Sequence, residues 1–231
     1  MPLLSFAALV TCHRRFSSSP PSGHFRRLSR RLGIAAMTSS ILLSIAAPSS
    51  TQAATDNASQ AEGVLLNIVS LASARLATAT PIAQWKWQNK QPVVDPQQDK
   101  ADAGVMTDLI KEATHFGLTT DYATSFFSDQ TSANNQFQSA LFDQWHHDSP
   151  PPPPDETALQ DARGNVYQIS EAMLAALAQV QTISQQAECP IWLSHAQTRW
   201  VTQMTTLSPA QQAALKTALR HVCRDGIGGT A

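Results

Sequence analysis

Hydrophobic residues recur at intervals of three and four through most of the chain after residue 56. This spacing places them on one face of an α-helix. The first such stretch forms a single apolar arc, made of Val64, Leu65, Ile68, Val69, Leu71, Ala72 and Leu76. No stretch shows the sustained two-residue alternation of a half-buried strand, and helix-favouring alanine, glutamine and leucine dominate. The pattern predicts an all-α fold.

Prolines separate the predicted helices. They stand at Pro81, Pro92, Pro96, Pro150–Pro154, Pro190 and Pro209. The intervals between them predict helices over residues 57–79, 81–90, 99–117, 119–147, 156–187, 190–204 and 209–224. The run of five prolines predicts a stiff, extended connector between two long helices. We therefore expect a single domain of six to seven helices.

The first fifty residues differ in character from the rest. Six arginines and no acid precede an apolar run over residues 33–47, and small residues follow it at 49–54. This is the layout of a secretory signal. A membrane anchor is the alternative, but about fifteen apolar residues diluted by Ser and Thr are short for a span. We expect residues 1–53 to direct export, to the periplasm or the medium, and to be cleaved off, leaving no stable membrane anchor.

The remaining residues are expected to form one domain, with core helices over 54–148 and the connector and last helices over 149–231. They keep ten of the 16 basic residues and all 17 acidic ones, a formal charge of about −7. This balance argues against nucleic acid as a partner, because phosphates demand a basic surface. Cys189 and Cys223 form an even pair in an exported chain, so we expect a disulfide that closes the C-terminal part. Two free buried thiols are the alternative.

Three cations fall where a helical core is expected. Arg75 lies inside the apolar arc of the first helix, and Arg163 lies within a stripe of the helix after the prolines that includes Tyr167. Lys86 is flanked by two tryptophans and follows Ile82 by four residues. A single such cation usually extends its head group to water. Three such cations among only ten basic residues suggest instead an interior pocket for an anionic ligand, such as a small dicarboxylate.

The long helix over 119–147 adds neutral donors. Gln130, Asn134 and Gln138 are spaced by four and share its apolar arc. A polar ladder satisfied within the core is the alternative. The sequence has no His/Cys/Glu grouping at metal-ligand spacing, no glycine-rich phosphate loop and no nucleophile motif. We therefore expect no metal and no cofactor, and chemistry that needs only charge stabilisation and shape.

Several segments together resemble the secreted chorismate mutases, over about residues 60–225. They are Ser73-Ala74-Arg75-Leu76, Pro81-Ile82-Ala83-Gln84-Trp85-Lys86-Trp87, Pro92-Val93-Val94-Asp95-Pro96, Phe126-Phe127-Ser128-Asp129-Gln130, Gln138 followed by Trp145, and Arg163 ten residues before Met173-Leu174. The Cys189–Cys223 pair matches the disulfide of that class. The order and spacing of these segments carry the resemblance, which implies an all-helical isomerase without cofactor.

The family converts chorismate to prephenate by an intramolecular Claisen rearrangement. By resemblance, Arg75 and Arg163 hold the two carboxylates of the substrate, a task that suits forked guanidinium groups. Lys86 and Gln138 donate to the ether oxygen whose bond breaks. Asp95 accepts from the ring hydroxyl, and Asn134 lines the pocket. Catalysis is then selection of the reactive conformer and fixed dipoles aimed at the developing charge.

The sequence departs from the family at one site position. The family usually has an arginine twelve residues after the lysine, where this chain has Gln98, followed by Asp99; Lys100 can supply the lost charge from a shifted turn. The departure predicts a slower enzyme, or a binding or effector protein on the same scaffold. A third hypothesis is a helical adaptor whose cations form salt bridges with Asp95, Asp99 and Asp102. The sequence leaves open whether the chain forms a homodimer.

Overall fold

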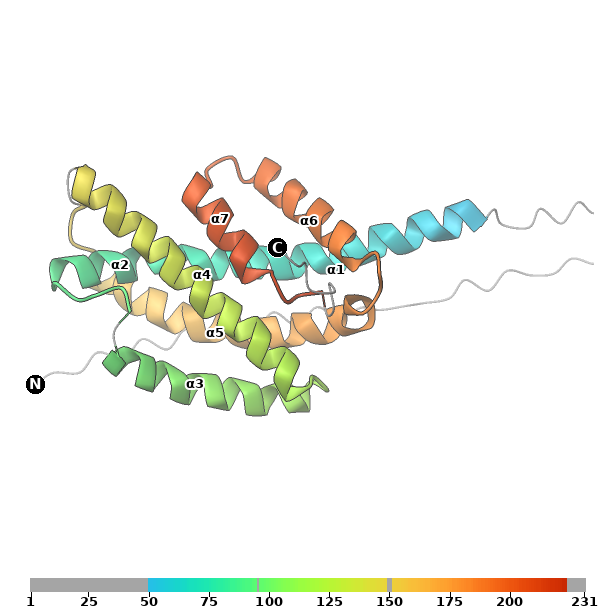
Figure 1. Cartoon of the computed structure of the whole chain (residues 1–231), viewed down its shortest axis with the longest axis horizontal. Coiled ribbons are helices and arrows are strands. Elements are labelled where there is room, and N and C mark those ends of the chain that lie inside the picture. The colour runs from blue at the N-terminus through green and yellow to red at the C-terminus, as the bar shows by residue number, and fades with distance from the viewer. Residues whose placement is uncertain (1–49, 95, 149–150, 224–231) are drawn as a thin grey trace, which may run out of the picture. The chain divides into compact units, whose positions relative to one another are not determined.

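The computed structural model of the chain describes residues 50–94, 96–148 and 151–223, and for residues 50–54 and 96–103 it describes the backbone alone. The described residues belong to one compact unit. Its described part contains seven helices and no strand (Figure 1). The helices are α1 (Ser50–Ala77), α2 (Ala79–Gln88), α3 (Pro96–His115), α4 (Thr120–His147), α5 (Glu156–Ser184), α6 (Cys189–Gln203) and α7 (Pro209–Ala218). The prediction of an all-α fold with six to seven helices is confirmed.

The sequence fixes several helix ends through local hydrogen bonds. The side chains of Thr119, Asp155 and Ser208 accept backbone N–H groups at the starts of α4, α5 and α7. At Ser208 the bond is reciprocal, because the side chain of Gln211 accepts the Ser208 N–H, and Pro209 occupies the first turn. α3 ends at His115, and Gly117, two residues later, adopts φ +75°, a conformation that glycine reaches without strain.

The last helix is shorter than predicted. It ends at Ala218, so the prediction of a helix to residue 224 is wrong. Side chains of α4 bind the backbone beyond that point: the Tyr122 hydroxyl donates to the Val222 carbonyl at 2.6 Å, and the His221 N–H donates to the Asp129 carboxylate at 3.0 Å. These partners replace the helical hydrogen bonds that a further turn of α7 would need.

A disulfide fastens the same C-terminal turn. Cys189, the first residue of α6, is bonded to Cys223, with an S–S length of 2.06 Å and a sequence separation of 34. Both cysteines are buried. The predicted pairing is confirmed, and the alternative of two free thiols is excluded.

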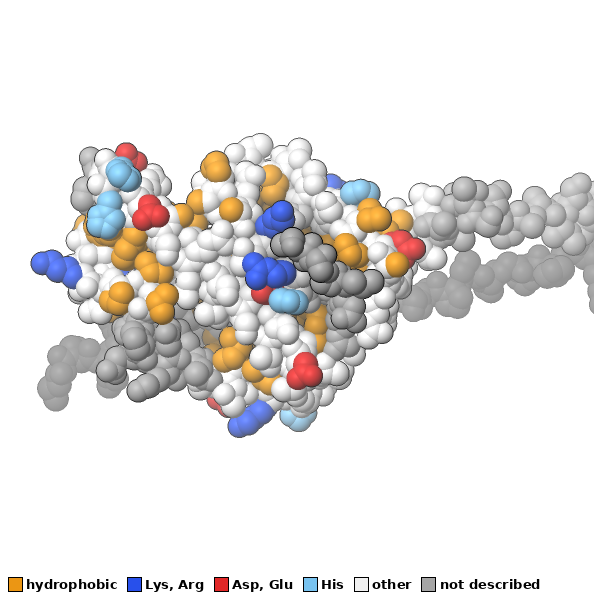
Figure 2. Space-filling model, in the orientation of Figure 1, with side chains coloured by type: hydrophobic (Ala, Val, Ile, Leu, Met, Phe, Trp, Pro, Cys, Tyr) orange, Lys and Arg blue, Asp and Glu red, His pale blue; other side chains and the backbone are white. Residues whose placement is uncertain are grey.

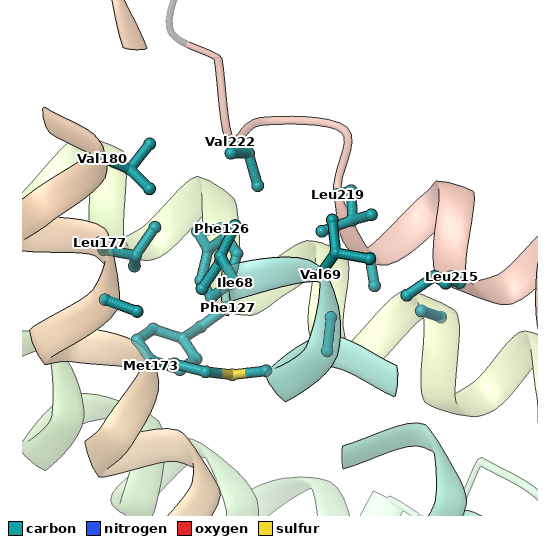
Figure 3. Packing of buried hydrophobic residues seen from close by; sticks show 14 of the residues in the cluster. Ile68, Val69, Phe126, Phe127, Met173, Leu177, Val180, Leu215, Leu219 and Val222 are labelled. Atoms are coloured by element: carbon teal, nitrogen blue, oxygen red, sulfur yellow. The ribbon is translucent and has the colours of Figure 1, made fainter. Parts of the chain in front are cut away.

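The core lies where α1 and α4 face α5, α6 and α7. α1 packs against α5 and α6, and α4 packs against α7. Figure 3 shows Ile68 and Val69 of α1 among side chains from α4, α5, α7 and the turn after it. The largest fully buried apolar side chains include Phe126, Phe127 and Leu177. Residues far apart in sequence thus share one core, which holds the helices in a fixed register.

The stretch Thr55–Gln88 is long and hydrophobic enough to span a membrane by length and composition alone. However, 44% of its apolar 18-residue segment is buried inside the protein. Leu65, Ile68 and Val69 in it are completely buried among the other helices. Its hydrophobicity is therefore accounted for by the core. The predicted export segment lies almost entirely outside the described residues; only its last few positions fall in α1, which begins at Ser50 rather than near residue 57.

Candidate functional site

Arg75 joins three helices. It lies near the C-terminal end of α1, is partly buried, and donates from Nε to the Ser170 hydroxyl of α5 at 3.4 Å. Its Nη1 donates to the backbone carbonyl of Gln130 in α4 at 3.2 Å. The Arg75 guanidinium is thus held by hydrogen bonds to two other helices.

Lys86 is the most buried of the three predicted cations. It lies on α2 and is 9% exposed, and its Nζ donates to the backbone carbonyl of Val93 at 2.6 Å. Val93 belongs to the segment between α2 and α3, which therefore folds back over the lysine. Removing an ammonium group from water is costly unless other polar groups surround it. The position accordingly marks Lys86 as a candidate for an anion-binding or hydrogen-bond-donating role.

Contacts of α1 and α2 with α4 define a parallel register. Arg75 meets Gln130 of α4, and Trp87 stacks edge-on against Phe142 and Trp145 of α4, with ring centroids 5.1 and 5.7 Å apart. The interval from Arg75 to Trp87 along α1 and α2 is similar in length to the interval from Gln130 to Phe142 along α4. Gln138 lies between them on α4, and Lys86 immediately precedes Trp87. Figure 2 shows hydrophobic side chains gathered over the end of the domain where α2 and α4 finish.

Contacts with α5 define an antiparallel register on the other side. Arg75 contacts Ser170. Trp85, ten residues after Arg75, contacts Arg163, which lies seven residues before Ser170. α2 therefore runs between α4 and α5, in contact with both. Arg75 and Lys86 consequently lie on α1 and α2, which both contact α4 and α5.

Gln138 has an unusual environment. It is 1% exposed, and its Oε1 is one of two buried polar side-chain atoms without a hydrogen-bond partner among the side chains described; the other is Nε1 of Trp200. A buried amide oxygen left unpaired costs about 1–3 kcal/mol. Functional sites are a common place for such a group. The alternative of a fully satisfied polar ladder on α4 therefore fails at this residue.

The other two amides of that row have different surroundings. Gln130 is 1% exposed and donates from Nε2 to the Ala218 carbonyl of α7 at 2.7 Å, so its side chain has a structural partner. Asn134 is partly buried, one turn before Gln138. Along this row, Gln130 thus makes a structural contact, whereas the amide oxygen of Gln138 has no partner among the described side chains.

Arg163 is not buried with the other two cations. The expectation of an interior position is wrong: Arg163 is exposed, and its guanidinium carbon lies 5.2 Å from the ring centroid of Trp85. Tyr167, one turn later in the predicted apolar stripe, is 49% exposed. The predicted stripe is thus exposed at Arg163 and Tyr167, whereas Leu174 and Leu177 farther along it are completely buried. Stacking on Trp85 holds the guanidinium at the surface.

Four predicted site residues lie in or beside the start of α3. Asp95 is outside the described residues. Gln98, Asp99 and Lys100 lie in α3, where the structure describes only the backbone. Their proposed roles, and the hypothesis of salt bridges to the acids of this segment, stay predictions.

Sequence reasoning missed two residues that touch the predicted cations. Ser170, which accepts from Arg75, is 1% exposed, and Trp85 stacks under Arg163. Ser170 follows Arg163 by seven residues, which places both on one side of a helix. A hydroxyl on the same side of the helix as Arg163, near Val166 and Leu174, could have indicated Ser170 as a polar contact of the site.

Comparison with known proteins identifies relatives of this chain. No protein-family model matches the chain. Among curated proteins, it is similar to the secreted chorismate mutase of Mycobacterium tuberculosis, with 27% identity over 190 residues that cover 82% of this chain and 92% of the relative. The secreted chorismate mutase of Mycolicibacterium smegmatis is 24% identical over 188 residues, which cover 81% of this chain and 99% of the relative.

Two solved structures extend the similarity to the fold. The chorismate mutase of Burkholderia thailandensis is 40% identical, with a TM-score of 0.64, and the match covers 69% of this chain and 99% of that structure. The chorismate mutase of Burkholderia phymatum is 28% identical, with the same TM-score and a match over 71% of this chain and 98% of that structure. Identity at this level over nearly the full length of a solved enzyme confirms the resemblance found in the sequence. The chain belongs to the chorismate mutase family.

Proposed function

We propose that this protein is an exported chorismate mutase, an isomerase that rearranges chorismate to prephenate. The observation that carries the proposal is the burial of Lys86, whose ammonium group lies inside the bundle on α2, next to α4 and α5. A cation held there at the expense of its hydration suits a site that binds negative charge. Family membership identifies which negative charge this is.

The proposed reaction breaks a C–O bond and forms a C–C bond within a single molecule. No group is transferred to or from the protein, so the protein needs no general base or nucleophile. Its tasks are to select the folded conformer of the substrate and to stabilise the charge that grows on the ether oxygen. Lys86 and Gln138 are the donors proposed for that oxygen.

Arg75 is proposed to bind a substrate carboxylate. Its guanidinium is already oriented by Ser170 and Gln130, so little conformational freedom is lost when it pairs with an anion. Arg163 is proposed for the second carboxylate, which it would meet from its exposed position beside Trp85. Asn134, Asp95 and the residues 98–100 complete the proposed set.

Export is the second part of the proposal. The curated relatives are named as secreted proteins, and the disulfide of this chain suits an oxidising compartment. We propose that residues 1–53 direct export and are cleaved. The mass of the protein recovered outside the cytosol tests this, because it gives the first residue of the mature chain.

The activity is tested by following the absorbance of chorismate after addition of purified protein. We expect loss of chorismate and formation of prephenate without added metal. Calorimetry with a bicyclic transition-state analogue provides a second measurement. Binding of the analogue without turnover would favour a binding or effector protein, whereas neither binding nor turnover would contradict the proposed function.

A further inference from the structure

We propose that Ser170 is a positioning residue for the reaction, acting through Arg75. This inference rests on the proposed function, because it assigns Arg75 to the substrate. Ser170 lies on α5 and is 1% exposed. It faces Arg75 of α1 across the interface of two helices that pack closely.

The hydrogen bonds of Ser170 have a defined direction. A hydroxyl has one proton to donate, and Ser170 donates it to the Val166 carbonyl, one turn earlier in α5, at 2.7 Å. The oxygen lone pairs are then left to accept, and Nε of Arg75 lies 3.4 Å away. Ser170 therefore acts toward Arg75 only as an acceptor, which is the role that orients a guanidinium.

A second acceptor completes the orientation. The Gln130 carbonyl accepts from Nη1 of Arg75 at 3.2 Å. Nε and Nη1 are fixed atoms of one planar group, so two acceptors on different helices define the direction of its plane. Loss of the Ser170 oxygen leaves Arg75 with one of these two anchors.

Ser170 has little to contribute to stability by itself. It lies in the interior of α5, and the Val166 carbonyl that it contacts already belongs to the backbone hydrogen-bond ladder of the helix. Alanine is a better helix former and leaves no buried hydroxyl to satisfy. Ser170→Ala should therefore leave the melting temperature unchanged or slightly raised, while it disturbs Arg75.

Ser184 provides a matched control. It is a completely buried serine in the last turn of the same helix, and its hydroxyl donates to the Gln181 carbonyl at 3.0 Å. Fourteen residues separate it from Ser170, about 21 Å along a helix. Ser184→Ala reproduces the loss of a buried hydroxyl without the loss of a contact to Arg75.

The test compares Ser170→Ala, Ser184→Ala, Arg75→Ala and the double variant Arg75→Ala/Ser170→Ala with the unmodified protein. Arg75 pairs with the same carboxylate before and during the reaction, so its misplacement weakens both states and acts mainly on KM. We expect Ser170→Ala to raise KM about tenfold, with kcat nearly unchanged. Ser184→Ala should leave both constants unchanged. In the Arg75→Ala background, Ser170→Ala should have no further effect.

Two results would overturn the assignment of Ser170. One is a Ser170→Ala enzyme with the kinetics of Ser184→Ala, and the other is an equal loss with and without Arg75. In either case the unmodified protein still turns over chorismate, so only the role of Ser170 fails. An unmodified protein that neither turns over chorismate nor binds the transition-state analogue contradicts the proposed function, and the inference falls with it.

Discussion

The guanidinium carbon of Arg163 lies 5.2 Å from the centroid of the Trp85 ring and joins the start of α5 to α2. This contact places a proposed substrate arginine on the surface, while Arg75, on the adjacent helix, is partly buried and bound to two other helices. The two arginines would therefore bind an anionic ligand at different degrees of exposure to solvent. Solvent weakens the pairing of Arg163 with an anion more than that of Arg75.

The first prediction follows from this difference. Arg75→Ala should lower kcat/KM about 100-fold, because it removes a charged donor from a partly desolvated position. Arg163→Ala should lower kcat/KM by less than about tenfold, since exposed ion pairs contribute little. Steady-state kinetics on chorismate measure both. An equal loss in the two variants would mean that the exposed position of Arg163 does not persist when substrate binds.

A second prediction concerns Lys86. Its ammonium is proposed to donate to the oxygen that becomes negative, so Lys86→Ala should reduce kcat about 100-fold to 1,000-fold, with a smaller change in KM. Lys111→Ala is the matched control, because the Lys111 side chain is 75% exposed and pairs only with Asp108 of its own helix at 3.8 Å among the contacts described. Loss of activity in both variants would point to net charge rather than to a donor at the reacting oxygen.

The sequence predicts most of the fold for identifiable reasons. Prolines and N-cap residues such as Ser208 act locally, so the helix starts near residues 120, 156, 189 and 209 are recognisable from sequence. The end of α7 is not, because residues 219–223 are held by Tyr122 and Asp129 of α4, about 90 to 100 positions away. A pattern read within one helix contains no information on such partners.

The candidate site shows the same division. Periodicity correctly placed Lys86 and Gln138 in the interior, because α4 and α2 are covered along those faces. It wrongly placed Arg163 and Tyr167 there, because an apolar stripe is buried only where another helix lies over it. The contact between Arg75 and Ser170, 95 positions apart, likewise depends on how α1 and α5 pack.

A third prediction concerns Gln98, where the family usually has an arginine. If a carboxylate of the substrate lacks a donor there, Gln98→Arg should raise kcat/KM by about tenfold or more, the effect of one hydrogen bond from a charged group. Gln97→Arg, the neighbouring position, adds the same charge at a different angle on α3 and serves as control. An equal gain in both would indicate general electrostatic attraction, and no gain in either would indicate that Lys100 already serves this role.

A fourth prediction concerns the disulfide. Replacing Cys189 and Cys223 by serine should lower the free energy of unfolding by about 3–4 kcal/mol, because the crosslink restricts a loop of 34 residues in the unfolded chain. For a domain of this size that corresponds to a fall of roughly 10 °C in Tm. Calorimetry on both proteins, with and without a reductant, measures it. A reductant should lower Tm only in the unmodified protein; the same fall in the variant would show that another effect is responsible.

A fifth prediction uses the amide of Gln138. An amide donates a hydrogen bond at any pH, so kcat should vary little between about pH 6 and 9. In Gln138→Glu the new carboxyl can donate only when protonated, and burial at a position that is 1% exposed raises its pKa above the ordinary value. The variant should therefore be active at low pH and lose about tenfold in kcat for each pH unit above that pKa. Rate profiles of both proteins in one buffer series provide the test. A steep alkaline loss already present in the unmodified protein, or a flat profile in the variant, would remove Gln138 from contact with the reacting oxygen.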